Sequence, residues 1–172
     1  MIRILKEKVK DTGMIQKITP FLWFDHQAEE VVNFYLTIFK RSKITRVTRY
    51  GTEGPGPEGT VMTVGFLLEG QQFVALNGGP AFAFSQAISF VVNCRTQKEI
   101  DRYWDLLSVG GEQQPCGWLK DRYGISWQVV PGALAGMLGD PDPERSRRVI
   151  KAMLPMGKLD LKMLRKAYGK KT

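Results

Sequence analysis

The chain has 172 residues, of which 43% are hydrophobic and 24% are charged, a composition typical of one globular domain with a sizeable core. Its apolar runs have the length of strands, which excludes a membrane-spanning helix, and its two cysteines, Cys94 and Cys116, are too few for a secreted disulfide scaffold. We therefore expect a cytoplasmic protein with both thiols reduced and with no membrane partner.

The net charge of +8 is concentrated at the two ends of the chain. Residues 141–172 hold ten Lys or Arg against three Asp or Glu, and residues 1–13 hold four against two. Residues 14–140 are therefore close to neutral, with a net charge of −1. Solvated helix faces explain such basic ends more often than a DNA site does, so nucleic acid is not an expected partner.

The first half of the chain predicts a strand, a helix and three further strands. Its strands are expected at residues 16–24, 42–50, 61–68 and 71–76. Asp25 is placed to cap the helix, whose apolar stripe runs over 28–39. The Gly/Pro-rich segment 51–60 predicts a loop, and Glu69-Gly70 predicts a hairpin turn.

The second half repeats this pattern. Thr96 and Glu99 form a capping-box pattern at the start of a helix, and strands are expected at 113–119 and 125–130. The closing hairpins of the two halves match when Gly70 is aligned with Gly124, Phe73 with Trp127 and Val74 with Gln128. Asp121 and Arg122, in the second of these hairpins, are expected to form a surface turn pair.

A repeated βαβββ unit predicts an α+β fold in which two modules form a concave mixed sheet with a cleft. The paired domain covers residues 14–131, with module one at 14–79 and module two at 86–131. Residues 1–13 form an N-terminal extension, or precede a start at Met14. Residues 132–172 predict basic C-terminal helices packed on or beside the domain, and Asp142-Pro143 is a typical helix start.

Three segments resemble one known family. They are 19–24 with the sequence TPFLWF, 77–80 with NGGP, and 116–128 with CGWLKDRYGISWQ. The chain is similar to PhnB-like proteins, a branch of the vicinal oxygen chelate superfamily that contains glyoxalase I, bleomycin-resistance proteins and extradiol dioxygenases. Members of this branch often carry the label 3-demethylubiquinone 3-methyltransferase. The resemblance implies a paired βαβββ fold, and superfamily members generally form dimers.

The resemblance also gives the positions of the metal ligands in metal-dependent relatives. Matched strand to strand, these positions are Lys17, Val74, Ala87 and Gln128. Only Gln128 could donate an oxygen to a divalent cation, and the chain's one histidine, His26, falls at a strand–helix turn. We therefore expect no metal site and no cofactor.

A methyltransferase activity is not supported by the glycines of the chain. A common S-adenosylmethionine site needs a Gly-rich turn between a parallel strand and a helix. Pro55 and Pro57 interrupt the Gly-rich segment here, and a strand follows it. We expect a hairpin loop over the mouth of the cleft.

Strand alternation predicts which side chains line the cleft. The expected ligand-binding residues are Thr19, Phe21, Trp23, Leu76, Ser89, Val91, Trp118 and Gln128. The opposite strand faces, with Ile18, Leu22, Phe73, Phe90 and Trp127, should pack against the helices. A mostly apolar cleft with a few neutral polar groups suits a small apolar or aromatic organic ligand.

The leading hypothesis is a metal-independent small-molecule binding protein that forms a homodimer, with its catalytic residues and any enzymatic activity left open. One alternative is a metal-dependent lyase, isomerase or oxygenase with a non-standard site. Another is a DNA-associated or regulatory protein that uses the basic C-terminal helices.

Overall fold

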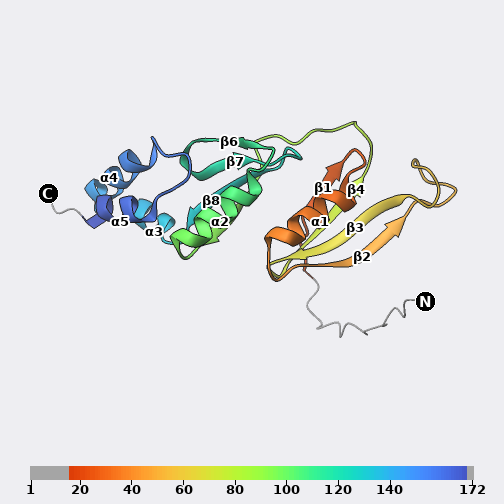
Figure 1. Cartoon of the computed structure of the whole chain (residues 1–172), viewed down its shortest axis with the longest axis horizontal. Coiled ribbons are helices and arrows are strands. Elements are labelled where there is room, and N and C mark those ends of the chain that lie inside the picture. Colours follow the sequence, from red (N-terminus) through yellow and green to blue (C-terminus); the bar gives the residue numbers. More distant parts are fainter. Residues whose placement is uncertain (1–15, 170–172) are drawn as a thin grey trace.

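The computed structural model describes residues 16–169. The N-terminal extension expected at 1–13 and the last three residues, 170–172, lie outside the described part of the chain. Figure 1 shows two sheet-and-helix modules side by side along the long axis, with the C-terminal helices at the end away from module one. No helix between residues 16 and 169 is both long and apolar enough to cross a bilayer.

The strand and helix order confirms the α+β fold built from two βαβββ modules. Module one contains β1 (Phe21–Phe24), α1 (Ala28–Ile38), β2 (Lys43–Arg49), β3 (Val61–Leu68) and β4 (Gln71–Asn77). Module two contains β5 (Ser89–Cys94), α2 (Gln97–Leu107), β6 (Glu112–Gln113), the 3-10 turn η1 (Pro115–Gly117), β7 (Trp118–Lys120) and β8 (Ser126–Pro131). Each module forms its own sheet, and no strand pairing joins the two sheets in the described chain.

The two sheets have the same topology. Sheet A has the order β1-β4-β3-β2 and sheet B the order β5-β8-β7-β6, and in each the first strand pairs in parallel with the last. Phe21 lies opposite Val74 in sheet A, and Val91 lies opposite Gln128 in sheet B. Gly70 and Gly124 both adopt positive φ, at 89° and 88°, which glycine reaches without steric cost. The repeat predicted from the hairpins is thus a structural repeat.

The first strand is shorter than predicted. It begins at Phe21 instead of residue 16, and Ile18, expected against the helices, is 83% exposed. The side chain of Gln16 takes the place of a paired backbone there, because its amide both donates to the carbonyl and accepts from the N–H of Gln72. The Gln16 side chain therefore satisfies the backbone of Gln72, and β1 need not extend further along β4.

The strand predicted at 113–119 is interrupted by η1. Pro115 has no N–H to give to a ladder, and Cys116 and Gly117 adopt positive φ values of 61° and 83°. Their N–H groups donate instead to the carbonyls of Met156 and Gly157 in the C-terminal segment, at 2.6 and 2.8 Å. This exchange of partners ties the C-terminal helices to sheet B.

Capping predictions were right for two helices and wrong for one. Thr96 Oγ1 accepts from the N–H of Glu99 at the start of α2, and Asp142 caps α4. Asp160 accepts from Met163 N at the start of α5. Asp25 does not cap α1, because the side chain of Asn77 accepts from Ala28 N at 2.8 Å.

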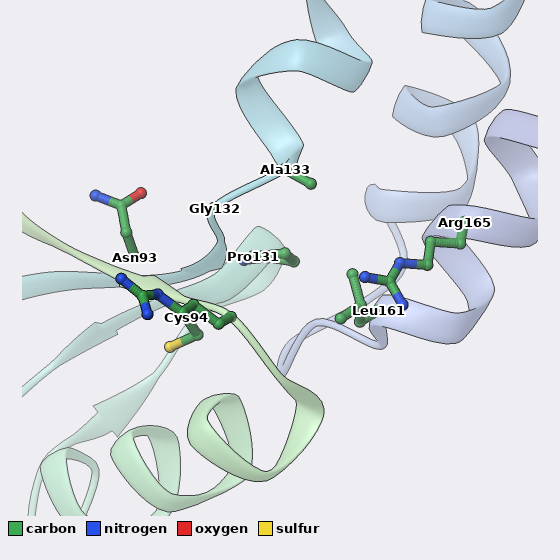
Figure 2. A pocket seen from close by; sticks show the side chains of 8 residues that line it. Asn93, Cys94, Pro131, Gly132, Ala133, Leu161 and Arg165 are labelled. Atoms are coloured by element: carbon green, nitrogen blue, oxygen red, sulfur yellow. The ribbon is translucent and has the colours of Figure 1, made fainter.

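The C-terminal segment forms α3 (Leu134–Leu138), α4 (Pro143–Met153) and α5 (Leu161–Gly169). These helices build a second small core around Leu134, Met137, Val149, Leu159 and Leu164. The chain leaves β8 through Gly132 and Ala133, and α5 approaches the ends of β5 and β8 (Figure 2). Ile150 on α4 and Leu154 at its C-cap are exposed.

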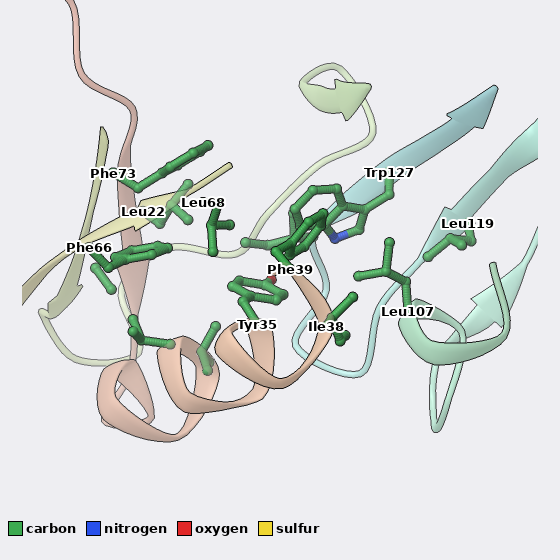
Figure 3. Close-up of a cluster of buried hydrophobic side chains, with 14 of the residues drawn as sticks. Leu22, Tyr35, Ile38, Phe39, Phe66, Leu68, Phe73, Leu107, Leu119 and Trp127 are labelled. Carbon is green, nitrogen blue, oxygen red and sulfur yellow. The ribbon is translucent and has the colours of Figure 1, made fainter. Parts of the chain in front are cut away.

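Helix α1 belongs to the cores of both modules. Tyr35, Ile38 and Phe39 lie between apolar residues of sheet A and residues of module two such as Leu107 and Trp127 (Figure 3). The rings of Tyr35 and Phe39 lie 5.4 and 5.6 Å from the Trp127 ring. Aromatic contacts at this spacing add to the free energy gained from burial alone. The helix-facing sides of both sheets therefore turn towards one shared core.

Candidate functional site

Sheet A carries three of the predicted ligand-binding residues. Phe21 and Trp23 on β1 lie on the face away from α1, and Leu76 on β4 pairs with Trp23 across the sheet. Their neighbours Leu22 and Phe24 point the other way and are buried. Phe21 is 58% exposed, which leaves its ring available for contact. Thr19 precedes the strand and is half-buried.

Trp23 is less available than Phe21, because the segment linking the modules covers it. Its indole Nε1 donates to the carbonyl of Gly79 at 2.9 Å, and the ring of Phe82 packs edge-on against it at 5.0 Å. A Cβ at Gly78 would collide with the indole, so glycine is required for this close approach. Trp23 thus fixes the segment between β4 and β5 to the sheet, in addition to lining the sheet face.

Sheet B brings four predicted residues together. Val91, Gln128 and Trp118 lie side by side on β5, β8 and β7, in one row across the sheet. The amide of Gln128 donates to Ser89 Oγ at 2.9 Å. The pair leaves the Gln128 carbonyl, its second N–H and the Ser89 hydroxyl proton for a ligand. Ser126 shares this face of β8 but is buried.

The two sets of predicted residues do not meet within one chain. Both sheets turn their helix-facing sides to the shared core, so the faces with Phe21 on sheet A and Val91 on sheet B turn away from that core. Val91 is 49% exposed. Each module therefore presents its half of the expected cleft as a separate surface, and on sheet A the linker covers Trp23.

The positions that hold metal in relatives offer few donors here. Val74 and Gln128 occupy matching places on β4 and β8, but Lys17 and Ala87 lie before the first strands of the modules. The side chain beside Gln128 is Ser89, two residues later than expected. Within residues 16–169, no three His, Cys, Asp or Glu side chains gather closely enough to hold a metal ion. This set of residues does not fit a divalent cation.

A groove of about 990 Å³ is lined by residues of both modules. The aromatic residues in its lining are Phe39, Phe73, Phe90, Tyr103 and Trp127. Lys40, Arg41, Arg95 and Arg102 lie among its basic lining residues and Glu69 and Glu99 among its acidic ones. Of the predicted ligand-binding residues, the groove contains only Val91.

Asp121 is the residue whose role was not predicted from the sequence. Expected in a surface turn, it is only 2% exposed and accepts four hydrogen bonds. Its donors are Tyr35 Oη at 2.6 Å, Trp127 Nε1 at 2.9 Å, Tyr123 N at 2.9 Å and Ile125 N at 3.0 Å. Burial raises the pKa of the Asp121 carboxyl, although the hydrogen bonds from Tyr35 and Trp127 oppose the rise. Burial and the neighbouring Asp121 charge also raise the pKa of Tyr35 well above its ordinary value.

Residues 16–130 match the model of the family described as 3-demethylubiquinone-9 3-methyltransferase. The chain belongs to this family. It is similar to the PhnB protein from Bacillus cereus, with 40% identity and a TM-score of 0.62 over 67% of this chain and 99% of that one. This PhnB-like assignment covers both modules but not the C-terminal helices. None of the curated proteins matches the chain.

Two more distant structures share the fold of this PhnB-like chain. Protein PA1353 from Pseudomonas aeruginosa is 21% identical, with a TM-score of 0.55 over 66% of this chain and 96% of that one. The fosfomycin resistance protein FosX from Listeria monocytogenes is 16% identical, with a TM-score of 0.54 over 73% of this chain and 98% of that one. These matches confirm the vicinal oxygen chelate fold.

Proposed function

We propose that this PhnB-like protein binds a small apolar or aromatic organic molecule on the outer faces of its two sheets, without requiring a metal ion. The supporting observation is the row of Val91, Gln128 and Trp118, with Ser89 hydrogen-bonded to Gln128. This row supplies apolar contact area and one neutral polar pair. Sheet A contributes Phe21, Trp23 and Leu76, whose side chains contain only one polar atom.

The cleft in this proposal is completed by a second copy of the chain. Within one chain the two ligand-binding faces turn away from each other, so neither can cover a ligand bound to the other. A homodimer that places sheet A of one protomer against sheet B of its partner would bury Phe21 and Val91. A two-fold symmetric pair would then contain two such clefts.

Methyl transfer, the activity in the family's name, is not the activity we propose. The Gly-rich segment between β2 and β3 packs against the ring of Tyr50 and is followed by a strand instead of a helix. Tyr50 is buried beneath it and donates a hydrogen bond to the carbonyl of Asn77. A Cβ at Gly54 or Gly56 would collide with the Tyr50 ring. These glycines are therefore explained by packing.

A metal-dependent enzyme is the alternative function. A structure of the FosX Glu-to-Gln variant contains Mn(II) and a dihydroxypropylphosphonic acid. A protein with this fold can therefore hold a divalent metal ion together with a small organic anion. In the present chain the matching positions provide a single donor, the side-chain carbonyl oxygen of Gln128, because Lys17, Val74 and Ala87 offer none. Metal analysis of the purified protein separates the two functions, because near-stoichiometric Zn, Mn, Ni or Fe would contradict a metal-free site.

The direct experiment is a thermal-shift screen with aromatic and quinone-like compounds, with and without EDTA. We expect stabilising compounds whose effect survives EDTA and is lost in Phe21→Ala. Leu154→Ala is the matched control, because Leu154 is 60% exposed, close to the 58% of Phe21, but lies beyond α4. Loss of every shift on adding EDTA would overturn the metal-free proposal. Equal shifts in wild type and Phe21→Ala would overturn the location of the cleft.

A further inference from the structure

The strands of sheet A carry positive charge and no carboxylate. β1, β2, β3 and β4 contain three cations, Lys43, Arg46 and Arg49, and no Asp or Glu. All three cations lie on β2, the edge strand of the sheet (Figure 1). The strands of sheet B hold one cation, Lys120, and the carboxylate of Glu112 on β6 pairs with it at 2.7 Å. Only sheet A therefore carries uncompensated positive charge on its strands.

A β-bulge turns one of these cations, Arg46, to the outer face of sheet A. The pairing register of β2 against β3 shifts between Ile44 and Arg46. Arg46 lies opposite Gly65 as a result, whereas regular pairing would place it opposite Val64, a fully buried core residue. Bulges are common at sheet edges and next to active sites, where they re-aim a side chain. This shift moves Arg46 from the helix-facing side of the sheet to the side proposed to bind a ligand.

The surroundings of Gly65 show that the Arg46 side chain begins on the outer face. The neighbours of Gly65 along β3, Val64 and Phe66, are buried in the core, so a side chain at Gly65 would point outwards. A Cβ at Gly65 would lie 3.7 Å from the Cβ of Arg46 and 3.0 Å from Thr45 Oγ1. Because glycine has no Cβ, the surface beside Arg46 stays open, with a threonine hydroxyl next to it.

Arg46 shares this face with the aromatic residues of β1. Two neighbouring rows cross the four strands, the first formed by Arg46, Gly65, Val74 and Phe21 and the second by Thr48, Thr63, Leu76 and Trp23. The hydroxyls of Thr48 and Thr63 are hydrogen-bonded to each other, as expected for side chains on one face. Neighbouring strands lie about 4.8 Å apart, so the Cα atoms of Arg46 and Phe21 are roughly 14 Å apart. One small molecule can therefore contact the long Arg46 side chain at one end and the Phe21 ring at the other.

The guanidinium of Arg46 has no partner among residues 16–169. Its side chain is exposed and makes no ion pair and no hydrogen bond in this range. Arg49, on the same strand, instead donates to the carbonyl of Gly59 at 2.9 Å. All five N–H donors of Arg46 are therefore available to an anion.

From this arrangement we infer that the outer face of sheet A selects an aromatic organic acid, and that Arg46 is the residue that determines specificity for the acid group. A guanidinium pairs with a carboxylate through two parallel N–H donors. The ring of the acid would lie over the open surface at Gly65 and contact Phe21 and Trp23. The inference rests on the function proposed above, because it names the class of ligand for the same sheet face.

The test is calorimetric titration of the full-length protein at low ionic strength with naphthoate and the corresponding naphthamide, two compounds of nearly equal shape that differ in charge. We expect saturable binding of naphthoate with about tenfold or higher affinity than that of naphthamide. Arg46→Gln should remove this preference, and Arg46→Lys should keep part of it, since lysine retains the charge without the paired donors. Arg49→Gln is the matched control, because it removes the same charge from the same strand at a side chain that already has a partner.

Equal affinities of the wild type for the two compounds would overturn the selection of an acid and leave the proposed function standing. Equal weakening of naphthoate binding in Arg46→Gln and Arg49→Gln would overturn the role of Arg46, because the preference would then come from net charge. Absence of saturable binding for both compounds would overturn the inference together with the ligand face itself. Phe21→Ala should weaken the binding of both compounds alike, which separates the location of the site from its choice of an acid.

Discussion

The hydroxyl of Tyr35 donates a 2.6 Å hydrogen bond to the buried carboxylate of Asp121, and this bond joins the helix of module one to the closing hairpin of module two. The same carboxylate oxygen accepts from Trp127 Nε1. Both rings also pack against each other in the shared core. These contacts tie module one to module two at the centre of the shared core.

Tyr35→Phe should lower the free energy of unfolding by about 1–3 kcal/mol, because it removes one of the donors to a buried charged group. Tyr123→Phe provides a matched control. The Tyr123 hydroxyl also donates to a carboxylate across the modules, that of Glu30 at 2.8 Å, but this bond is exposed to solvent. We expect its loss to cost less than about 0.5 kcal/mol. Urea unfolding of both variants checks this, and equal costs would contradict a special role for the buried bond.

The stability of the protein should depend on pH through Asp121. Its pKa is raised by burial, so the folded protein takes up this proton more readily than the unfolded chain. The associated stability is fully present below the unfolded pKa and is lost as the pH rises through the folded pKa. The free energy of unfolding of wild type, relative to that of Asp121→Asn, should therefore increase as the pH falls below neutral. A difference that is constant or shrinks on acidification would contradict the direction of the shift.

Trp127→Ala should destabilise the protein by roughly 3–5 kcal/mol, because it empties a large site in the core. Trp127 is 3% exposed and packs against Tyr35, Phe39 and Phe90. Gln128→Ala, one residue along the same strand, should cost little, since Gln128 lies on the opposite face of β8. Equal denaturant midpoints for the two variants would show that the faces of β8 are assigned wrongly.

The two cysteines should differ strongly in their reaction with iodoacetamide. Burial raises the pKa of the Cys94 thiol to about 12, so only roughly one part in ten thousand is thiolate at pH 8. Cys116 is partly exposed. Mass spectrometry of the folded protein should show modification at Cys116 long before Cys94, and Cys116→Ser should leave almost no early product. Modification of Cys94 at a similar rate would mean that sheet B opens easily near β5.

Light scattering at micromolar concentration should give about twice the chain mass of 19.4 kDa. The uncovered apolar residues on the outer sheet faces, Phe21 and Val91 among them, are the physical reason. Phe21→Arg should shift the protein towards the monomer by placing a charge in the interface. A monomeric wild type would contradict the proposal that a second protomer completes the cleft.

Local patterns in the sequence were enough to predict the order of the elements, two of the helix starts and the two faces of β8. The Thr96–Glu99 pattern and the Asp142-Pro143 start predicted where α2 and α4 begin, because a cap bonds to the N–H groups of the next few residues. Alternation along β8 placed Trp127 in the core and Gln128 on the outer face, because successive side chains of a strand point to opposite faces. The match between the two closing hairpins predicted the two modules, because similar sequences fold into similar units.

Contacts between distant segments decided the environment of Asp121, the cap of α1 and the directions of the two sheet faces. Asp121 reads as a turn residue, and only the approach of Tyr35, 86 residues earlier, makes it a buried acceptor. Asn77 displaced Asp25 as the capping partner of α1 from 49 residues away. The separation of the two sheet faces that we propose to bind a ligand likewise arises when the two modules pack against each other. Packing brings together side chains that are far apart in the sequence at irregular spacings, so a local sequence pattern does not predict these contacts.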